Sequence, residues 1–445
     1  MAETKLSISD IIDGRKLNGF QKMIITLCTM IAFVEGFDAQ SAGFVAPALA
    51  KVWGLGHNAL ALFFSLGLFG LMMGALIVAP LADRTGRKPV LLGCLVLFGL
   101  GSLGMAASTS LEMLYLTRLV TGVGIGGAMP NVIALTSEYA PRRIRSLMVV
   151  VMYNGFIGGS IAAGLTTARI VEALGWNSVF IVGGVLPLLL APIILFLLPE
   201  SVRFLASKAG REAKVEVLMR RIDPSLSSGT RFFLDEHSEV RMSVVALFRD
   251  GRGRKTILLW LLVFCSLLDL FLMTNWLPTQ IASLGVSVAL AILIGTLLQV
   301  GGMIGMIQGW MMDRWGPSRT LTLSYLIAAV AIACIGLVGD NVPLLAASVL
   351  GAGFGIIGGQ TAANAVAAGA YPTEIRSTGI GWFLGIGRIG SIVGPALAGF
   401  LLSIGVTNRD VFLLAMIPAL CAAAAAYALG NTVKSTETAE QREAA

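Results

Sequence analysis

Hydrophobic and polar positions are arranged in long blocks along the chain. Twelve apolar runs, each long enough to cross a bilayer at about 20 residues per helix, are separated by short polar stretches. The runs cover residues 23–48, 59–81, 89–108, 112–136, 146–170, 177–198, 256–282, 287–312, 320–338, 342–368, 378–404 and 409–430. This pattern predicts an all-α integral membrane protein with twelve transmembrane helices.

One polar segment interrupts the pattern between the sixth and seventh runs. Residues 199–255 are dense in charge, and we expect a surface helix over 202–221 that ends at Asp223 and Pro224. The chain is therefore predicted to contain an N-terminal segment 1–22, a six-helix bundle 23–198, a cytoplasmic central segment 199–255, a second six-helix bundle 256–430 and a tail 431–445.

The placement of positive charge predicts the orientation in the membrane. Charged residues make up 13% of the chain, whereas soluble domains contain about 25%. With both termini on one side, the loops on the other side hold Lys51, Arg169 and Arg409 as their only Lys or Arg residues. The positive-inside rule then puts both termini in the cytoplasm. The net charge of +7 follows from this topology, so no nucleic-acid partner is expected.

The two halves of the chain repeat each other. A shift of 231 residues aligns Asp38 with Asp269, Pro47 with Pro278, Gly122 with Gly353, Gly124 with Gly355, Gly127 with Gly358, Arg145 with Arg376 and Ser146 with Ser377. A shift of 230 aligns residues 83–86 with 313–316. The repeat predicts two pseudo-symmetric halves of six helices, an arrangement in which the substrate site lies near the bilayer midplane between the halves.

Two carboxylates lie inside the first apolar run. Glu35 and Asp38 are three residues apart, so they share one helix face, and each costs about 2.5 kcal/mol or more in lipid. We interpret them as the proton-coupling residues, although pairing with an Arg that only holds helices together is an alternative. Arg118, in the fourth run, keeps its charge and needs a counter-ion, carbonyls or water. It is expected to interact with Glu35 or Asp38, in a coupling or gating role or in a structural pair.

The second half contains one deep cation, Arg388, among small residues of the eleventh run. A guanidinium is a bidentate receptor for a substrate carboxylate, but Arg388 is also a candidate ion-pair partner of Asp269. Asp269, Asn275 and Trp276 add an acid, an amide and an indole to the candidate substrate site, and Phe37 adds a ring. Trp276 is alternatively a residue of the membrane-interface belt.

The loop after the second run carries a specific motif. Its sequence G-(x)8-D-R-T-G-R-K, over residues 74–88, resembles the signature of the major facilitator superfamily, and residues 313–316 resemble the second copy found in that family. In the family the Asp of this motif helps to latch the cytoplasmic side shut, a role that the resemblance implies for Asp83. The expected gating residues are Asp83, Arg84, Gly86, Arg87, Glu138, Arg145, Asp313, Arg314, Glu374 and Arg376.

Shorter segments resemble one branch of this superfamily. The sequences E-G-F-D at 35–38, N-W-L-P-T at 275–279 and G-I-G-R-I-G at 385–390 are similar to those of aromatic acid:proton symporters, although that branch typically has D-G-x-D in the first span. The resemblance implies alternating-access import of benzoate-like or hydroxylated aromatic acids, with protons, across a bacterial inner membrane. We expect the protein to act as a monomer.

Other functions are weighed against this interpretation. A carrier of other small organic anions or of sugar-like polyols is the nearest alternative, and a membrane sensor with a transporter fold is more remote. The sequence contains no GxSxG, HExxH or Walker motif, so an enzyme is not expected. The five Cys residues form no CxxC pair, and neither a disulfide, a metal nor a cofactor is predicted. Because His57 and His237 are expected in loops, proton transfer is assigned to carboxylates.

Overall fold

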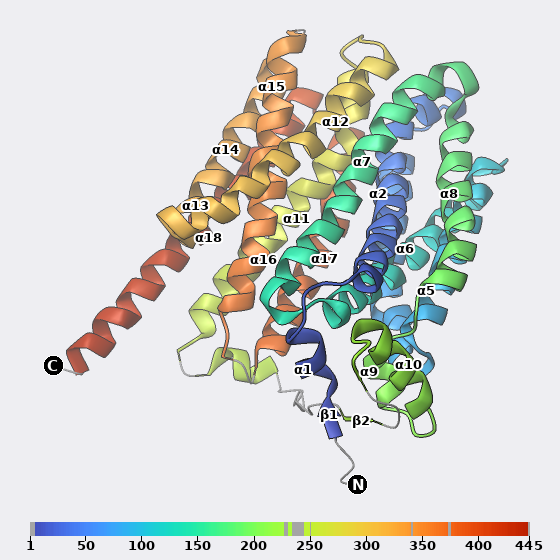
Figure 1. Ribbon diagram of the computed structural model, residues 1–445. Coiled ribbons are helices and arrows are strands. Elements are labelled where there is room, and N and C mark those ends of the chain that lie inside the picture. The colour runs from blue at the N-terminus through green and yellow to red at the C-terminus, as the bar shows by residue number, and fades with distance from the viewer. Residues whose placement is uncertain are drawn as a thin grey trace. The chain divides into compact units, whose positions relative to one another are not determined.

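The computed structural model describes residues 5–226, 230–233, 244–249, 251–339, 341–372 and 375–443. These residues are helical apart from two short strands and the connecting loops (Figure 1). Twelve helical stretches in the described ranges are long and apolar enough to cross a membrane, and their limits lie within a few residues of most of the predicted runs. The prediction of an all-α protein with twelve transmembrane helices is confirmed.

The elements follow one another along the chain. The first half contains β1 (Lys5–Ser7), α1 (Ile8–Asp13), α2 (Gly19–Trp53), α3 (His57–Met73), α4 (Ala82–Thr85), α5 (Arg87–Ala106), α6 (Leu111–Tyr139), α7 (Arg145–Leu174) and α8 (Trp176–Leu197). The central segment contains α9 (Val202–Ala206), α10 (Glu212–Ile222) and β2 (Arg231–Phe233). The second half contains α11 (Gly253–Ala282), α12 (Val288–Ile304), α13 (Gln308–Trp315), α14 (Pro317–Leu337), α15 (Val342–Gly353), α16 (Gly359–Gly369), α17 (Arg376–Ser403) and α18 (Asn408–Glu443).

The contacts divide the chain into two compact units. The first unit consists of Met1–Ser41, Leu66–Thr166 and Ala173–His237, and the second consists of Ala42–Ser65, Thr167–Glu172 and Ser238–Ala445. The division passes through α2, α3 and α7, so a stretch of each of these helices belongs to the second unit. Each unit is described separately below.

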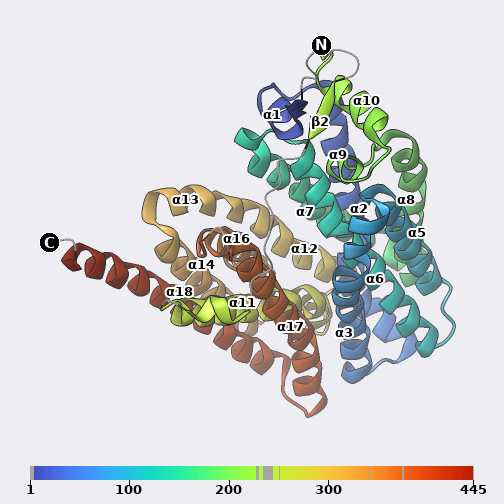
Figure 2. The same ribbon diagram turned by 90° about the horizontal axis from the view of Figure 1, so that it is seen from below.

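Glycines allow the helices of the first unit to pack backbone to backbone. A β-carbon on Gly70 of α3 would collide with the carbonyl oxygen of Leu119 in α6, and one on Gly122 of α6 would collide with the carbonyl oxygen of Gly67 in α3. Figure 2 shows α3 lying beside α6. Small residues at such contacts are typical of membrane helices, because apolar burial drives helix association little in lipid.

The same contacts recur in the second unit, 231 residues later in the chain. A β-carbon on Gly353 of α15 would collide with the carbonyl oxygen of Leu298 in α12, and one on Gly301 of α12 would collide with that of Leu350 in α15. Both pairs are the counterparts of the contacts between α3 and α6. Repeated backbone contacts at this shift confirm the two pseudo-symmetric halves.

The central segment differs from the prediction. The prediction of a single surface helix over 202–221 is wrong, because two helices, α9 and α10, occupy this stretch. Between them the chain turns at Gly210, whose φ of 78° is readily adopted only by glycine. The second helix ends at Ile222, next to the predicted end.

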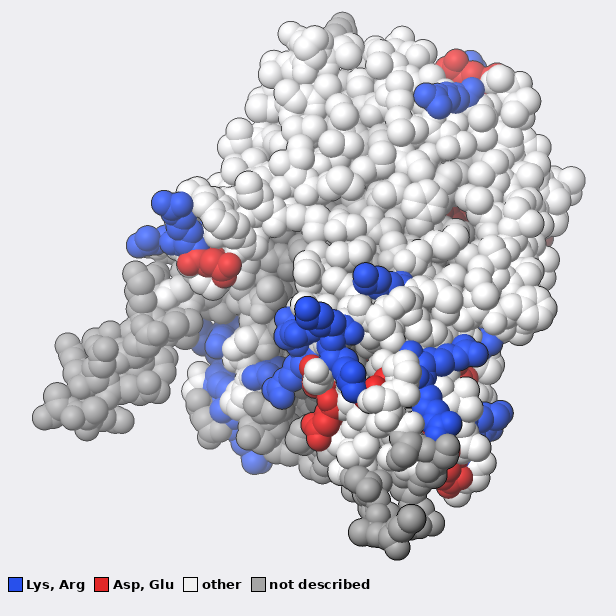
Figure 3. Space-filling model, in the orientation of Figure 1, with Lys and Arg blue, Asp and Glu red and all other residues white. Residues whose placement is uncertain are grey.

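The N-terminal segment folds together with the central segment. Strand β1 pairs in parallel with β2, with Lys5 opposite Arg231 and Ser7 opposite Phe233. Figures 1 and 2 show α1, β2, α9 and α10 grouped at one end of the first unit. We call this the charged end, because on the face shown in Figure 3 most Lys, Arg, Asp and Glu side chains gather toward it, whereas the sides of the helices are almost uncharged.

Candidate functional site

Asp38 lies at the centre of a polar cluster in the first unit. Its side chain is 0% exposed and projects from α2 toward α5 and α8. A β-carbon on Gly183 of α8 would be 3.0 Å from Asp38 Oδ1 and 3.1 Å from Ser102 Oγ of α5. Because Gly183 has no side chain, the carboxylate and the hydroxyl can lie next to each other above it. Neither Ser102 nor Gly183 was anticipated from the sequence.

Arg118 brings a positive charge to the same cluster from α6. Its side chain is 5% exposed, and the guanidinium occupies the space above Gly67 of α3, where a β-carbon would be 2.8 Å from Cζ. Asp38 and Arg118 interact electrostatically. Of the two acids expected near Arg118, the structure thus brings Asp38 to it.

Glu35 has different surroundings although it lies on the same helix. It is 0% exposed, and neither carboxylate oxygen has a hydrogen-bond partner within the described part of the chain. The thiol of Cys94 in α5 is a titratable group that interacts with it. Two acids on one helix face therefore have different neighbours, Arg118 for Asp38 and Cys94 for Glu35.

Asp269, the counterpart of Asp38 in the second unit, is also buried. Its Oδ1 atom has no hydrogen-bond partner among the residues that the structure describes. Its titratable neighbours include Tyr325 of α14 and Cys265 of α11, and the Tyr325 hydroxyl is 2.8 Å from Ser266 Oγ. Arg388, on α17, is half-buried. Tyr325 has no distinguishing sequence signal, because a Tyr in an apolar run is usually a packing residue.

Trp276 is fully buried within the second unit. Its indole nitrogen donates a hydrogen bond of 3.0 Å to Pro395 O, and its ring packs against those of Phe64 and His57 at centroid distances of 5.5 and 6.0 Å. The alternative assignment of Trp276 to the interface belt is therefore wrong. The expectation that His57 lies in a loop is also wrong, because His57 is the first residue of α3.

The other two predicted substrate residues are buried as well. Asn275 donates a hydrogen bond of 2.7 Å to Phe271 O in the preceding turn of α11. Phe37, in the first unit, is part of the packed core. In this conformation these side chains serve helix packing, and their contact with a substrate stays a prediction.

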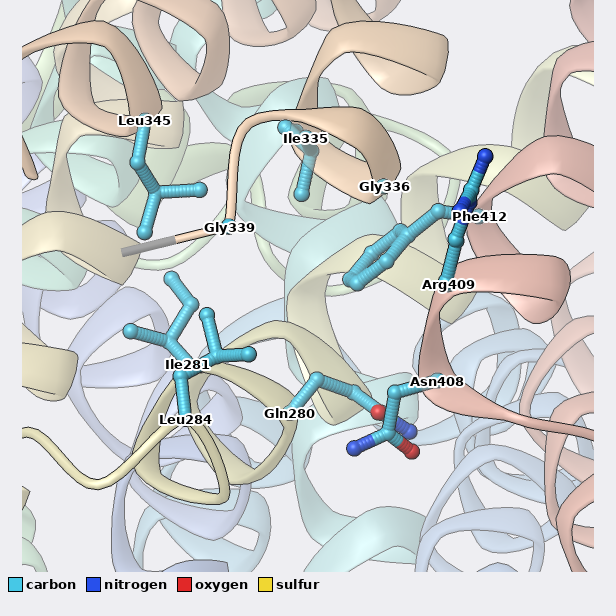
Figure 4. Close-up of a pocket in the computed structure, with 10 residues that line it drawn as sticks. All are labelled: Gln280, Ile281, Leu284, Ile335, Gly336, Gly339, Leu345, Asn408, Arg409 and Phe412. Carbon is cyan, nitrogen blue, oxygen red and sulfur yellow. The ribbon is translucent and has the colours of Figure 1, made fainter. Parts of the chain in front are cut away.

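A pocket opens in the second unit (Figure 4). It is lined by Gln280, Ile281, Leu284, Ile335, Gly336, Gly339, Leu345, Asn408, Arg409 and Phe412. The predicted substrate residues are not part of its lining, so this pocket is distinct from the predicted site.

The predicted gate motif forms a network at the charged end of the first unit. Arg87 Nε lies 2.9 Å from Glu138 Oε1. Glu200 Oε1 accepts hydrogen bonds from the backbone N–H groups of Arg87, Lys88 and Ser201 at 2.7, 3.2 and 2.8 Å. This carboxylate therefore caps the N-terminus of α5, where the helix dipole favours a negative charge. Glu200 is not among the gate residues predicted from the sequence.

Gly86 is required by the shape of this loop. Its φ is 103°, and its counterpart Gly316 has a φ of 87°. A β-carbon at Gly86 would also collide with the Glu200 carboxylate. The conformation and the contact both explain why a glycine follows the D-R-T sequence.

The remaining gate residues lie on or near the surface. Asp83, Arg84, Asp313 and Arg314 are exposed. Arg145 Nε donates to Ala140 O at 3.4 Å, and Arg376 Nε donates to Tyr371 O at 3.3 Å, so the same hydrogen bond occurs in the corresponding loop of each half. Glu374 lies outside the described residues. Within those residues, no three His, Cys, Asp or Glu side chains are grouped so that they could hold a metal ion.

Comparison with known proteins identifies the class. Residues 28–356 and 259–445 match the family model of the Major Facilitator Superfamily. A bacterial homologue of the human lysosomal transporter Spinster, in an inward-facing unoccupied conformation, has the same fold, with a TM-score of 0.73 and 16% identity over 93% of this chain and 98% of that one. The chain belongs to the major facilitator superfamily, a superfamily of transporters.

Curated relatives are similar over nearly the whole length. The gallate transporter of Pseudomonas putida is 39% identical over 431 residues, which cover 96% of each chain. The 4-hydroxybenzoate transporter PcaK of Pseudomonas aeruginosa is 40% identical over 433 residues, which cover 96% of this chain and 97% of the relative. Both relatives are transporters of aromatic acids by name.

Proposed function

We propose that the protein imports small aromatic carboxylic acids together with protons across the bacterial cytoplasmic membrane. The observation that carries this proposal is the identity of about 40% with a 4-hydroxybenzoate transporter over nearly the full length of both chains. Both termini are proposed to be cytoplasmic, because the charged end carries α1 and the central segment and because the positive-inside rule favours that side.

Asp38 is the proposed proton carrier. Its carboxylate is removed from water and lies beside the fixed charge of Arg118, so that protonation removes a negative charge next to the guanidinium. Such a change of charge biases the conformations of a carrier toward one side or the other. Glu35 is a second proton-binding group in this proposal, and its burial without a hydrogen-bond partner among the described residues supports the role.

Arg388 is the proposed receptor for the substrate carboxylate. A guanidinium presents parallel N–H donors to both oxygens of a carboxylate. Asp269 and Asn275 lie in the same half of the chain and supply further polar groups for the bound acid. Phe37 and Trp276 are proposed to contribute aromatic surface after they leave the packing seen here.

The network around the D-R-T-G-R-K loop is proposed to act as the inner gate. Two contacts of Arg87 hold this network together. Its side chain pairs with Glu138 at the end of α6, and its backbone N–H at the start of α5 donates to Glu200, where the central segment begins. Opening the cytoplasmic side requires such contacts to change. Asp83 is proposed as a further member of this gate, and its exposed carboxylate is available to pair with a helix end in another conformation.

The substrate class is tested by competition. Uptake of labelled 4-hydroxybenzoate into proteoliposomes is measured with an excess of unlabelled gallate or benzoate, and in parallel with a non-aromatic acid or a polyol. The proposal expects the aromatic acids to compete and the other compounds to have little effect. Equal competition by the non-aromatic acid would favour a general organic-anion carrier instead.

A further inference from the structure

Ser102 of α5 lies between Asp38 and the backbone of α8. Its side chain is fully buried, and its hydroxyl donates a hydrogen bond of 3.0 Å to Phe180 O. Gly183, three residues further along α8, leaves the space in which Ser102 Oγ and Asp38 Oδ1 lie side by side. A side chain at position 183 would fill this space, and a larger apolar residue in place of Ser102 would remove the hydroxyl.

The hydroxyl can satisfy only one acceptor at a time. A serine side chain has one O–H donor and two lone pairs. Here the donor is directed to Phe180 O, and the Ser102 hydroxyl is also close enough to Asp38 to act as its hydrogen-bond partner. A protonated Asp38 can donate its own O–H to Ser102 Oγ without disturbing that bond. An ionised Asp38 requires the donor itself, so the hydroxyl must turn away from Phe180.

We propose that Ser102 is a positioning residue for the proton step, whose hydroxyl turns between Phe180 O and Asp38 as Asp38 gains and loses its proton. The proposal rests on the proposed role of Asp38 and adds a group that allows the acid to ionise while buried. No proton leaves Ser102 in this step. Rotation of the hydroxyl also links the protonation of Asp38 on α2 to a backbone hydrogen bond of α8, the one at Phe180 O.

The charged groups around Asp38 come from few elements. Arg118 on α6 is the cation that interacts with it, and Glu35 lies one turn away on α2. Helix α5 faces it with the Ser102 hydroxyl, and α8 faces it with Gly183. Among these groups, Ser102 can act as a neutral donor.

The variant Ser102→Ala tests the proposal through the pH dependence of exchange. Counterflow of labelled 4-hydroxybenzoate is measured in proteoliposomes, with equal pH on both sides, between about pH 6 and pH 9, a range chosen around neutrality. A hydrogen bond to an ionised acceptor is stronger than one to a neutral acid, so its loss disfavours the carboxylate. The midpoint of the pH profile is expected to move upward by about half a unit or more.

Ser160→Ala is the matched control. Ser160 of α7 is also fully buried, and its hydroxyl lies within hydrogen-bond distance of two backbone acceptors, Phe156 O at 2.9 Å and Gly36 O at 3.2 Å. This variant loses a buried hydroxyl and a hydrogen bond to the backbone, but Ser160 is not one of the groups described above as facing the Asp38 carboxylate. Its midpoint should equal that of the unmodified protein.

Gly183→Ala gives an independent test if Ser102→Ala does not fold. Its added methyl group separates the carboxylate from the hydroxyl, so the midpoint should again move upward. An unchanged midpoint in a variant that still exchanges 4-hydroxybenzoate overturns the proposal for Ser102. Absence of exchange by the unmodified protein overturns the proposed function instead, so the two failures are distinguishable.

Discussion

At the scale of single residues, the chemistry of the site depends on which groups meet a buried charge. The sequence indicates that Asp38 and Arg118 need partners, because charges in apolar runs are costly. It does not indicate Ser102 or Gly183, since a serine and a glycine in transmembrane helices are common and their relevance depends on how α5 and α8 are rotated. The sequence therefore predicts which charged residues are important, but it does not predict which side chains surround them.

Arg388 allows the sharpest prediction at this scale. Arg388→Ala removes the proposed receptor of the substrate carboxylate, and hydrogen bonds to charged groups contribute about 1.5–3 kcal/mol. The KM for 4-hydroxybenzoate uptake should therefore rise at least about tenfold. Uptake kinetics in proteoliposomes measure this change. A KM that stays within about threefold, below 1 kcal/mol, would exclude the carboxylate-receptor role.

At the scale of helices, the sequence predicts where membrane segments begin and end but not how shorter pieces fold. Long apolar runs leave little choice in lipid, because every backbone polar group must be satisfied within the segment. The central segment is polar and has no such constraint, so a turn at Gly210 divides the expected helix. Strands β1 and β2 have three residues each, too few for a recognisable pattern.

The contact between α3 and α6 leads to a prediction about stability. Gly70→Ala places a methyl group against the carbonyl oxygen of Leu119, and overpacking of this kind costs about 1–3 kcal/mol. The melting temperature of the purified protein in detergent should fall. Gly93→Ala in α5 is the control, because no atom lies within 4 Å of its added β-carbon. Equal melting temperatures of the two variants would contradict the close packing described here.

The N-terminal segment leads to a second prediction at this scale. Burial raises the pKa of Asp223, but hydrogen bonds from Ser225 and the charge of Arg15 outweigh this effect and lower the pKa below its ordinary value. Arg15 Nη2 lies 2.7 Å from Asp223 Oδ2. The stabilisation is thus present above the pKa of an unfolded Asp and is lost as the pH falls through the lowered folded value.

Asp223→Asn removes this charge and should loosen the N-terminal segment. We expect faster cleavage after Arg15 by trypsin at neutral pH than in the unmodified protein. Limited proteolysis followed by mass spectrometry measures the cleavage rate. An unchanged cleavage rate would show that the strand pair and α1 hold the segment without the ion pair.

At the scale of the whole molecule, the duplication is the feature that the sequence predicts best. Glycines at helix contacts recur at one shift because the packing of each half depends on them, and Gly353 against Leu298 repeats Gly122 against Gly67. The division into compact units was less predictable. Within the second unit, Gly43 of α2 packs against the carbonyl oxygen of Thr274 in α11. The pattern of apolar runs does not predict this contact.

Proton-driven accumulation tests the central claim most directly. Purified protein in liposomes is given labelled 4-hydroxybenzoate with an imposed pH gradient, acid outside, as the only source of energy, and protein-free liposomes correct for passive entry of the neutral acid. The account predicts accumulation above equilibrium by the unmodified protein, and equilibration without accumulation by Asp38→Asn. Failure of the unmodified protein to accumulate the acid, or equal accumulation by Asp38→Asn, would contradict it.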